Sequence, residues 1–185
     1  MVELQPFTEA DWPTLIGWID SPEFMMQWGG PAFSYPLDAA QLEPLLRAAA
    51  AKEPEVLLFK AVDSEDRQTV GHIQLLAIDR ANRSARIGRV LVGPPHLRGR
   101  GIGTQMIRAL LHIAFARLGL HRIDLYVFDF NYGAIACYEK SGFRRKGVLR
   151  DARKVGDAYW SLVEMSILEE EWWAGCTGAE GAQQC

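Results

Sequence analysis

Cysteine is scarce in this sequence, and long apolar runs are absent. The 3 cysteines among 185 residues are an odd number with no pair at metal-ligand spacing, so we expect neither a disulfide framework nor a metal site. No stretch approaches the roughly 18 apolar residues of a membrane span, and no basic segment leads into an apolar run of signal-peptide length. We therefore expect a protein of the reducing cytoplasm.

The sequence also lacks a large excess of either positive or negative charge. The chain has 20 Lys and Arg against 23 Asp and Glu, a net charge of −3, whereas proteins that bind nucleic acid carry a basic face. We therefore expect no nucleic-acid partner, and no membrane partner. Arginines do cluster at 80–100 and at 144–153, where they either cover solvated strand ends or lie near an anionic ligand.

The apolar pattern changes its period along the chain, from helical to strand-like and back. Spacing near 3.6 residues, with capping residues, predicts helices at 9–19, 22–28, 39–52, 101–118 and 131–140. Apolar runs between turns predict strands at 2–5, 56–62, 70–78, 85–92, 122–128, 143–150 and 158–168.

This order of elements predicts an α/β (α+β) fold, with helices flanking a mixed, mostly antiparallel sheet of six to seven strands. The strands between 56 and 92 follow one another across short polar turns, which is typical of an antiparallel meander. No repeat or linker divides the chain, so we expect residues 1–173 to form a single domain. Residues 174–185 are rich in Gly, Ala and Gln, and we expect a disordered tail there.

The turn at 98–103, Arg-Gly-Arg-Gly-Ile-Gly, joins a strand to a long amphipathic helix. The first N–H groups of a helix have no internal partners and the helix dipole favours negative charge, so this turn predicts an anion site. Its glycines let phosphate oxygens approach the main chain without meeting a Cβ. Arg98 and Arg100 add guanidinium groups that pair with phosphate.

Three phosphate-binding motifs compete for this turn. A P-loop requires Lys and then Ser or Thr after its last glycine, but Thr104 and Gln105 follow here, which excludes it. The dinucleotide fingerprint needs its third glycine at 104 or 106, where Thr and Met stand, and an early βαβ unit in place of the meander. The third motif, Arg/Gln-x-x-Gly-x-Gly/Ala, matches 98–103 without a gap.

A second pattern lies downstream at 131–143, Asn-Tyr-Gly-Ala-Ile-Ala-Cys-Tyr-Glu-Lys-Ser-Gly-Phe. Asn131 can cap a helix, and Tyr138 follows two turns later on nearly the same face. Gly142 supplies a left-handed exit, and Phe143 begins the next strand inside the core. A capped amphipathic helix explains each residue separately, but not the order and spacing of both motifs.

Together the two segments resemble the pyrophosphate loop and the second acetyl-CoA motif of the GCN5-related N-acetyltransferase (GNAT) superfamily. The resemblance covers roughly residues 2–173, and the flanks at 4–12 and 147–151 resemble the RimJ/RimL-like branch. It implies a GNAT fold with a sheet splayed at the cofactor site. It also implies an N-acetyltransferase that moves an acetyl group from acetyl-CoA to a primary amine of a small molecule or protein N-terminus, by direct attack in a ternary complex.

The resemblance also implies roles for individual residues. The turn would bind the pyrophosphate of acetyl-CoA, a co-substrate used without a metal, and the strand before it would pair its main chain with the pantetheine arm. Tyr138 would protonate the leaving thiolate as general acid, with core packing as its alternative role. The cofactor-binding set is Val90, Leu91, Val92, Arg98, Gly99, Arg100, Gly101, Ile102, Gly103, Thr104 and Asn131.

The general base stays open. Many relatives carry a carboxylate on the strand before the glycine turn, but the strand at 85–92 has none. Polar candidates on other strands and their ends are His72, Gln74, Asp79, Asp124, Asp129 and Glu164. His72 has the right chemistry for a base, with a structural role as its alternative.

Acceptor-binding residues are expected in the first helices and the final hairpin, with Trp28, Tyr35 and His72 as candidates. With Glu23 and Asp38, the aromatic residues would line a weakly acidic pocket for a cationic amine, unless tryptophans at helical spacing belong to the core. The alternative function is a catalytically silent acyl-CoA-binding sensor or interaction module. The acceptor stays open, as does the choice between monomer and homodimer.

Overall fold

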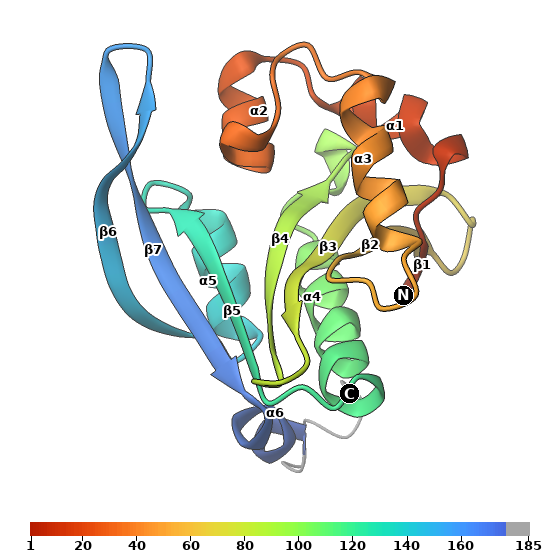
Figure 1. Ribbon diagram of the computed structural model, residues 1–185, viewed down its shortest axis with the longest axis vertical. Helices are drawn as coiled ribbons and strands as arrows, with labels where there is room; N and C mark the ends of the chain where they lie inside the picture. The colour runs from red at the N-terminus through yellow and green to blue at the C-terminus, as the bar shows by residue number, and fades with distance from the viewer. Residues whose placement is uncertain (177–185) are drawn as a thin grey trace.

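The computed structural model (Figure 1) describes residues 1–176 and contains a seven-stranded sheet with the order β1-β2-β3-β4-β5-β7-β6. Neighbouring strands are antiparallel, except for the parallel pair β4 and β5. The predicted fold class is confirmed. The strands are β1 Val2–Pro6, β2 Leu57–Asp63, β3 Thr69–Asp79, β4 Ser84–Val92, β5 Arg122–Phe128, β6 Arg144–Val155 and β7 Ala158–Leu168.

Helices cover both faces of the sheet and enclose two hydrophobic cores. Met106 and Ile135, on α4 and α5, belong to one core, and Leu15 and Leu42, on α1 and α3, belong to the other. The helices are α1 Trp12–Trp18, α2 Pro22–Gly29, α3 Ala39–Ala49, α4 Ile102–His112, α5 Tyr132–Lys140 and α6 Glu169–Cys176. The short helical turns are η1 Glu9–Asp11, η2 Gly30–Ala32, η3 Pro95–Leu97 and the π-helix η4 Ile113–Arg117.

A β-bulge reverses the faces of β4. Residues 72–74 of β3 lie opposite residues 88–91 of β4, so β4 contains one extra residue between these two paired positions. Arg89, inside the bulge, has a φ of 51°. Ile87 consequently lies in one core and Leu91 in the other, although their even spacing would put both on one face of a regular strand.

The parallel contact between β4 and β5 is short. Ser84, Ala85 and Arg86 pair with the first residues of β5, and the two strands then diverge toward α2 (Figure 1). The sheet is therefore splayed, as the resemblance implies. Between residues 87 and 92, part of the main chain of β4 pairs with β3, and none of it pairs with β5.

Some boundaries differ from those expected. The helix expected at 101–118 is α-helical only as far as His112, and α3 ends at Ala49 rather than at 52. β6 continues to Val155 rather than to 150. Most of its residues are exposed and none is buried, and the residues after 150 are mainly charged, so they show no apolar alternation by which the extension could be recognised.

Residues 174–176 of the expected disordered tail are helical, because α6 extends to Cys176. The remainder of the expected tail, 177–185, lies outside the described residues. Three glutamates open α6, where they suit the positive end of the helix dipole. Over residues 1–176, no helix is long and apolar enough to cross a membrane, and no three His, Cys, Asp or Glu side chains gather where they could hold a metal ion.

Candidate active site

The glycine turn forms the N-terminus of α4. Gly99 and Gly101 have φ values of 77° and 82°, in the left-handed region that glycine adopts without a Cβ penalty. Gly101 is the N-cap, and its carbonyl oxygen accepts from the N–H of Gln105 at 3.1 Å. The N–H groups at 102–104 precede this first helical bond, so the helix offers them no acceptor and they favour an anion.

Arg98 ties this turn to the end of β4. Its Nε donates to the carbonyl oxygen of Val92 at 3.0 Å, and its second terminal nitrogen donates to that of Gly93 at 3.1 Å. The guanidinium also lies 5.4 Å from the ring centroid of Phe24 on α2. Arg98 therefore positions the turn, in addition to placing positive charge beside it.

A groove of about 490 Å³ runs from the glycine turn between β4 and α5. This glycine-turn groove is lined by every expected cofactor-binding residue except Arg100 and Ile102. Arg100 is exposed outside it, and the Ile102 side chain is 9% exposed in the core, so Ile102 offers the site only its backbone N–H. Cys137 of α5 lines the groove and lies 3.2 Å from the Thr104 hydroxyl.

α5 brings Asn131 and Tyr138 to the same groove. Asn131 caps the helix, and its Oδ1 accepts from the N–H of Ala134 at 3.2 Å. Tyr138 is 7% exposed and packs edge-on against Phe143, with ring centroids 5.8 Å apart. Burial, and secondarily the neighbouring Cys137, raises the pKa of Tyr138, so its phenol stays protonated through neutral and moderately alkaline pH.

A second cavity, of about 280 Å³, adjoins the groove. It is enclosed by α2, η2, the bulge in β4, the end of β5 and the β6–β7 hairpin. Five residues line both spaces, Gln27, Val90, Asn131, Ala134 and Tyr138. Because these residues form a shared wall that includes Tyr138, a group bound in the cavity and a group bound in the groove approach each other across it.

The structure brings one of the three expected acceptor residues into this cavity. Trp28 lines it. Tyr35 is 44% exposed, and its hydroxyl donates to the carbonyl oxygen of Asp20 at 3.1 Å, away from the cavity. His72 is also outside the lining, because it points into the buried face of the sheet at 1% exposure.

The environment of His72 gives it a structural role. The Oε1 of Gln74 accepts from Arg89 at 2.6 Å, so its amide nitrogen donates to His72 Nε2 at 2.8 Å. His72 Nδ1 then carries the proton, buried with no hydrogen-bond partner among residues 1–176. Burial, followed by the charge of Arg89, lowers the pKa of His72 to about 3, so the ring is neutral at physiological pH.

None of the six candidate bases is among the described residues that line the groove or the cavity. Asp124 is bound by Arg86 and Arg122, each at 2.6 Å. Asp79 accepts two hydrogen bonds from Asn82. These carboxylates hold parts of the sheet together, and the general base stays unassigned.

The charge of the cavity corrects the sequence-based expectation. In place of a weakly acidic pocket, three arginines line it, Arg86, Arg89 and Arg153, and Glu23 and Asp38 lie outside it. Sequence reasoning missed these residues as site residues. The signal was present, since all three belong to the two arginine clusters for which an anionic ligand was one interpretation.

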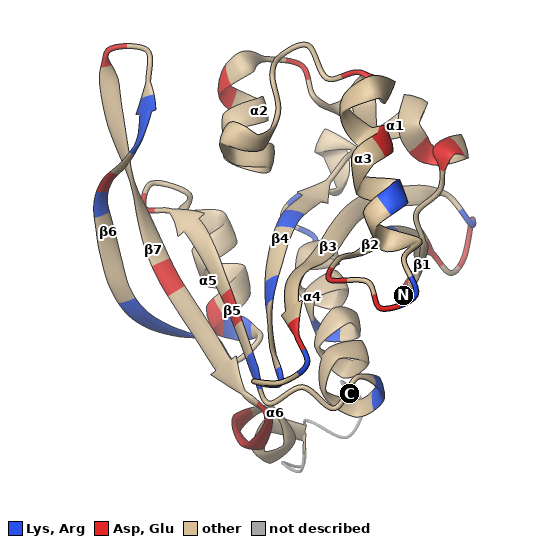
Figure 2. Cartoon of the chain, in the orientation of Figure 1, with Lys and Arg blue, Asp and Glu red and all other residues tan. Residues whose placement is uncertain are grey.

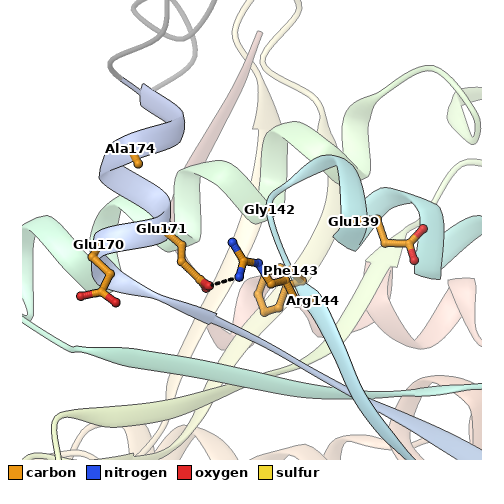
Figure 3. Close-up of a pocket in the computed structure, with 7 residues that line it drawn as sticks. All are labelled: Glu139, Gly142, Phe143, Arg144, Glu170, Glu171 and Ala174. Carbon is orange, nitrogen blue, oxygen red and sulfur yellow. Dashed lines mark ion pairs between the residues drawn. The ribbon is translucent and has the colours of Figure 1, made fainter.

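A separate hollow lies where α6 meets the start of β6 (Figure 3). Two of its three carboxylates form ion pairs: Glu171 pairs with Arg144 at 3.0 Å, as Figure 3 shows, and Glu139 pairs with Arg145 at 2.8 Å. Neither the glycine turn nor Tyr138 lines this hollow. It is therefore distinct from the candidate active site.

Comparison with known proteins identifies the family. The model of the acetyltransferase (GNAT) domain matches residues 2–144, so the chain belongs to the GNAT family of acetyltransferase domains. This confirms the resemblance inferred from the glycine turn and the 131–143 segment.

Individual relatives differ in what they are named for. Spermidine N(1)-acetyltransferase of Vibrio cholerae is 29% identical over 60% of this chain and 63% of its own length. Putative ribosomal N-acetyltransferase YdaF of Bacillus subtilis is 34% identical over 58% of this chain and 57% of its own. The chain spans 57% to 66% of the length of the first four curated relatives it matches.

Solved structures support the fold. Spermidine N-acetyltransferase from Vibrio cholerae, in complex with CoA and spermine, has a TM-score of 0.80 at 24% identity, covering 93% of this chain and 98% of that one. The similarity extends over nearly the whole of both chains.

Proposed function

We propose that this protein is an acetyl-CoA-dependent N-acetyltransferase that transfers an acetyl group to a primary amine by direct attack in a ternary complex. The observation that carries the proposal is the position of Tyr138, in the wall shared by the glycine-turn groove and the second cavity. The groove supplies an anion-binding helix terminus for the donor. The cavity supplies a separate space for the acceptor.

The residues of the groove fit the donor. The N–H groups at 102–104 suit a pyrophosphate, and the left-handed glycines at 99 and 101 keep Cβ atoms away from it. The main chain at 90–92 lines the groove without pairing to β5, so it is available to bond an extended pantetheine arm as an added strand would. A backbone N–H of this segment would polarise the acyl carbonyl oxygen.

Acetyl-CoA supplies an activated thioester. The amine nitrogen bonds to the acyl carbon, the carbon–sulfur bond breaks, and Tyr138 donates its phenolic proton to the departing thiolate. The proton that the nitrogen loses on becoming an amide returns, through water, to the Tyr138 phenolate. The raised pKa of Tyr138 suits this role, because the phenol is fully protonated beforehand. With no Asp, Glu or His among the described residues of the cavity lining, the amine loses its proton to water, and nearby positive charge lowers its pKa and so favours this loss.

Release of the CoA thiol with a panel of primary amines tests the proposal. Initial rates at varied acetyl-CoA and amine should give intersecting double-reciprocal lines, as a ternary complex requires. Saturable acetyl-CoA binding without thiol release for any amine would instead support the acyl-CoA-binding sensor. The absence of a carboxylate or imidazole in the described cavity lining is the feature that keeps this sensor as the second candidate.

Several finer points stay predictions. They are membership of the RimJ/RimL-like branch, a cytoplasmic location, a peptide N-terminus as acceptor, the lack of nucleic-acid and membrane partners, and a monomeric or homodimeric state. Relatives named for spermidine, a ribosomal substrate and an aminoglycoside point to different acceptors, so they do not select one for this chain.

A further inference from the structure

The acceptor-side cavity carries positive charge that acetyl transfer itself does not require. Arg86, Arg89 and Arg153 line it, and no acidic residue among 1–176 does so. Figure 2 shows basic residues on both β4 and β6, the strands that supply these arginines. Only Arg86 of the three forms an ion pair with a carboxylate of the described chain.

Arg89 is held in place by groups that leave its charge uncompensated. One terminal nitrogen donates to Gln74 at 2.6 Å, and the guanidinium lies 4.8 Å from the ring centroid of Phe33. Its Nε is buried without a hydrogen-bond partner among residues 1–176. Burial lowers the pKa of Arg89, which shows that the charge is poorly solvated.

Arg153 approaches from the other side of the cavity, on β6. One of its terminal nitrogens donates to the carbonyl oxygen of Ala152 at 2.7 Å. A guanidinium has five N–H donors, so Arg153 and Arg89 both keep donors for a ligand. Arg89 and Arg153 therefore line one cavity from two different strands, each without a carboxylate partner among residues 1–176, and guanidinium groups with free donors pair readily with a carboxylate.

Aromatic and apolar side chains form the rest of the described lining, among them Trp28, Tyr126 and Phe128. They suit an apolar body between the anion and the reacting amine. A second ammonium, as in a polyamine, would be placed in a cavity whose lining has no carboxylate and has two guanidinium groups, those of Arg89 and Arg153, without a carboxylate partner among residues 1–176. Like charges in a poorly solvated space repel strongly, so such an acceptor is disfavoured.

We propose that the acceptor is a small amine that also carries a carboxylate, which Arg89 and Arg153 bind while the amine faces Tyr138. This inference deepens the proposed function and depends on it for the fate of the amine. The recognition itself depends on the two arginines alone. Binding and turnover can therefore be tested separately.

Three probes that differ in one group provide the test: 4-(aminomethyl)benzoate, 4-(aminomethyl)benzamide and 1,4-bis(aminomethyl)benzene. Calorimetric titration in the presence of CoA gives their affinities, and thiol release with acetyl-CoA gives kcat/KM. We expect the benzoate to bind at least about tenfold more tightly than the amide, as a charge-assisted pair predicts. The diamine is expected to bind most weakly.

Variants of two arginines on β6 provide the control. Arg153→Gln should remove most of the benzoate preference and Arg153→Lys should keep part of it. Arg150→Gln should leave it unchanged, because Arg150 is exposed on the same strand outside the cavity lining. Melting curves verify that each variant is folded.

Equal affinity for benzoate and benzamide, or tighter binding of the diamine, would overturn the proposal. A benzoate preference that survives Arg153→Gln would do so as well. If the benzoate binds as expected but no thiol is released with any probe, the anion site stands and the proposed acetyltransferase function fails.

Discussion

The indole N–H of Trp28 donates a hydrogen bond to the carbonyl oxygen of Arg89, at 3.1 Å. This bond joins α2, on the acceptor side, to the bulge that opens β4. The bulge is also where Arg89 adopts its φ of 51°. The bond thereby couples the position of α2 to the course of β4, which is the strand that lines both the groove and the cavity.

Trp28→Phe should disturb that coupling. The variant keeps an aromatic ring but leaves a buried carbonyl without its donor, a loss of about 1 kcal/mol or more. We expect kcat/KM for the acceptor to fall roughly tenfold, with a smaller change in KM for acetyl-CoA. Trp173→Phe, on the partly exposed face of α6, is the control, and an equal effect of both substitutions would contradict the coupling.

Tyr138→Phe should lower kcat by roughly 10²-fold, the usual contribution of a general acid. Because only the hydroxyl is removed, KM for acetyl-CoA should change little. Tyr132→Phe, on the same helix with 76% exposure, should retain full activity. A variant with wild-type kcat at position 138 would show that the phenol is not the acid.

We expect the same tyrosine to set the alkaline limb of the rate. Its pKa is raised above the ordinary value of 10, and as the proposed general acid it would act in its protonated form. The kcat of the wild-type enzyme should therefore not decline up to about pH 10. A decline that begins near pH 8 would assign the acid to another group.

Gly101→Ala should weaken donor binding. A Cβ at a φ of 82° costs about 1 kcal/mol, and relaxation of the strain would move the N–H groups that start α4. We expect a several-fold rise in KM for acetyl-CoA and a lower melting temperature. Gly17→Ala, inside α1 with open space around its Cβ, should leave KM unchanged, because alanine is favoured in helices.

His72 should make the fold sensitive to acid. Its pKa is about 3 when folded against an ordinary 6.5, so the unfolded chain takes up a proton that the folded chain does not. The stability contributed by the neutral ring is present above pH 6.5 and is lost progressively as the pH falls toward 3. In His72→Gln the loss of melting temperature over this range should shrink, whereas in His96→Gln, on the exposed turn η3, it should not.

Local sequence patterns were enough to predict much of the fold and the acetyl-donor side of the candidate site. The glycine turn and the 131–143 segment are contiguous in sequence, and their geometry follows from capping and helix periodicity. The strands of the sheet were likewise recognisable, because most of them have enough apolar residues to show a period; β6 was predicted only in part.

The acceptor side was harder to predict, because it depends on contacts between distant segments. Arg89 lines the cavity only because a bulge shifts β4 by one residue against β3, and the strand pattern does not reveal this shift. Arg153 reaches the cavity from an exposed strand about sixty residues later in the sequence. His72 and Tyr35 have suitable side chains, but His72 is buried in the sheet and Tyr35 is exposed on the surface.

The early end of the β4–β5 pairing has a consequence for the fold as a whole. A sheet that parts in its middle leaves backbone groups facing an internal gap, and a ligand that fills the gap becomes part of the framework. Occupancy then contributes to the free energy of unfolding by mass action, by about 2.7 kcal/mol when the ligand is at 100 times its dissociation constant. If the gap binds the acetyl donor as proposed, the folded fraction of the protein will rise with the concentration of that donor.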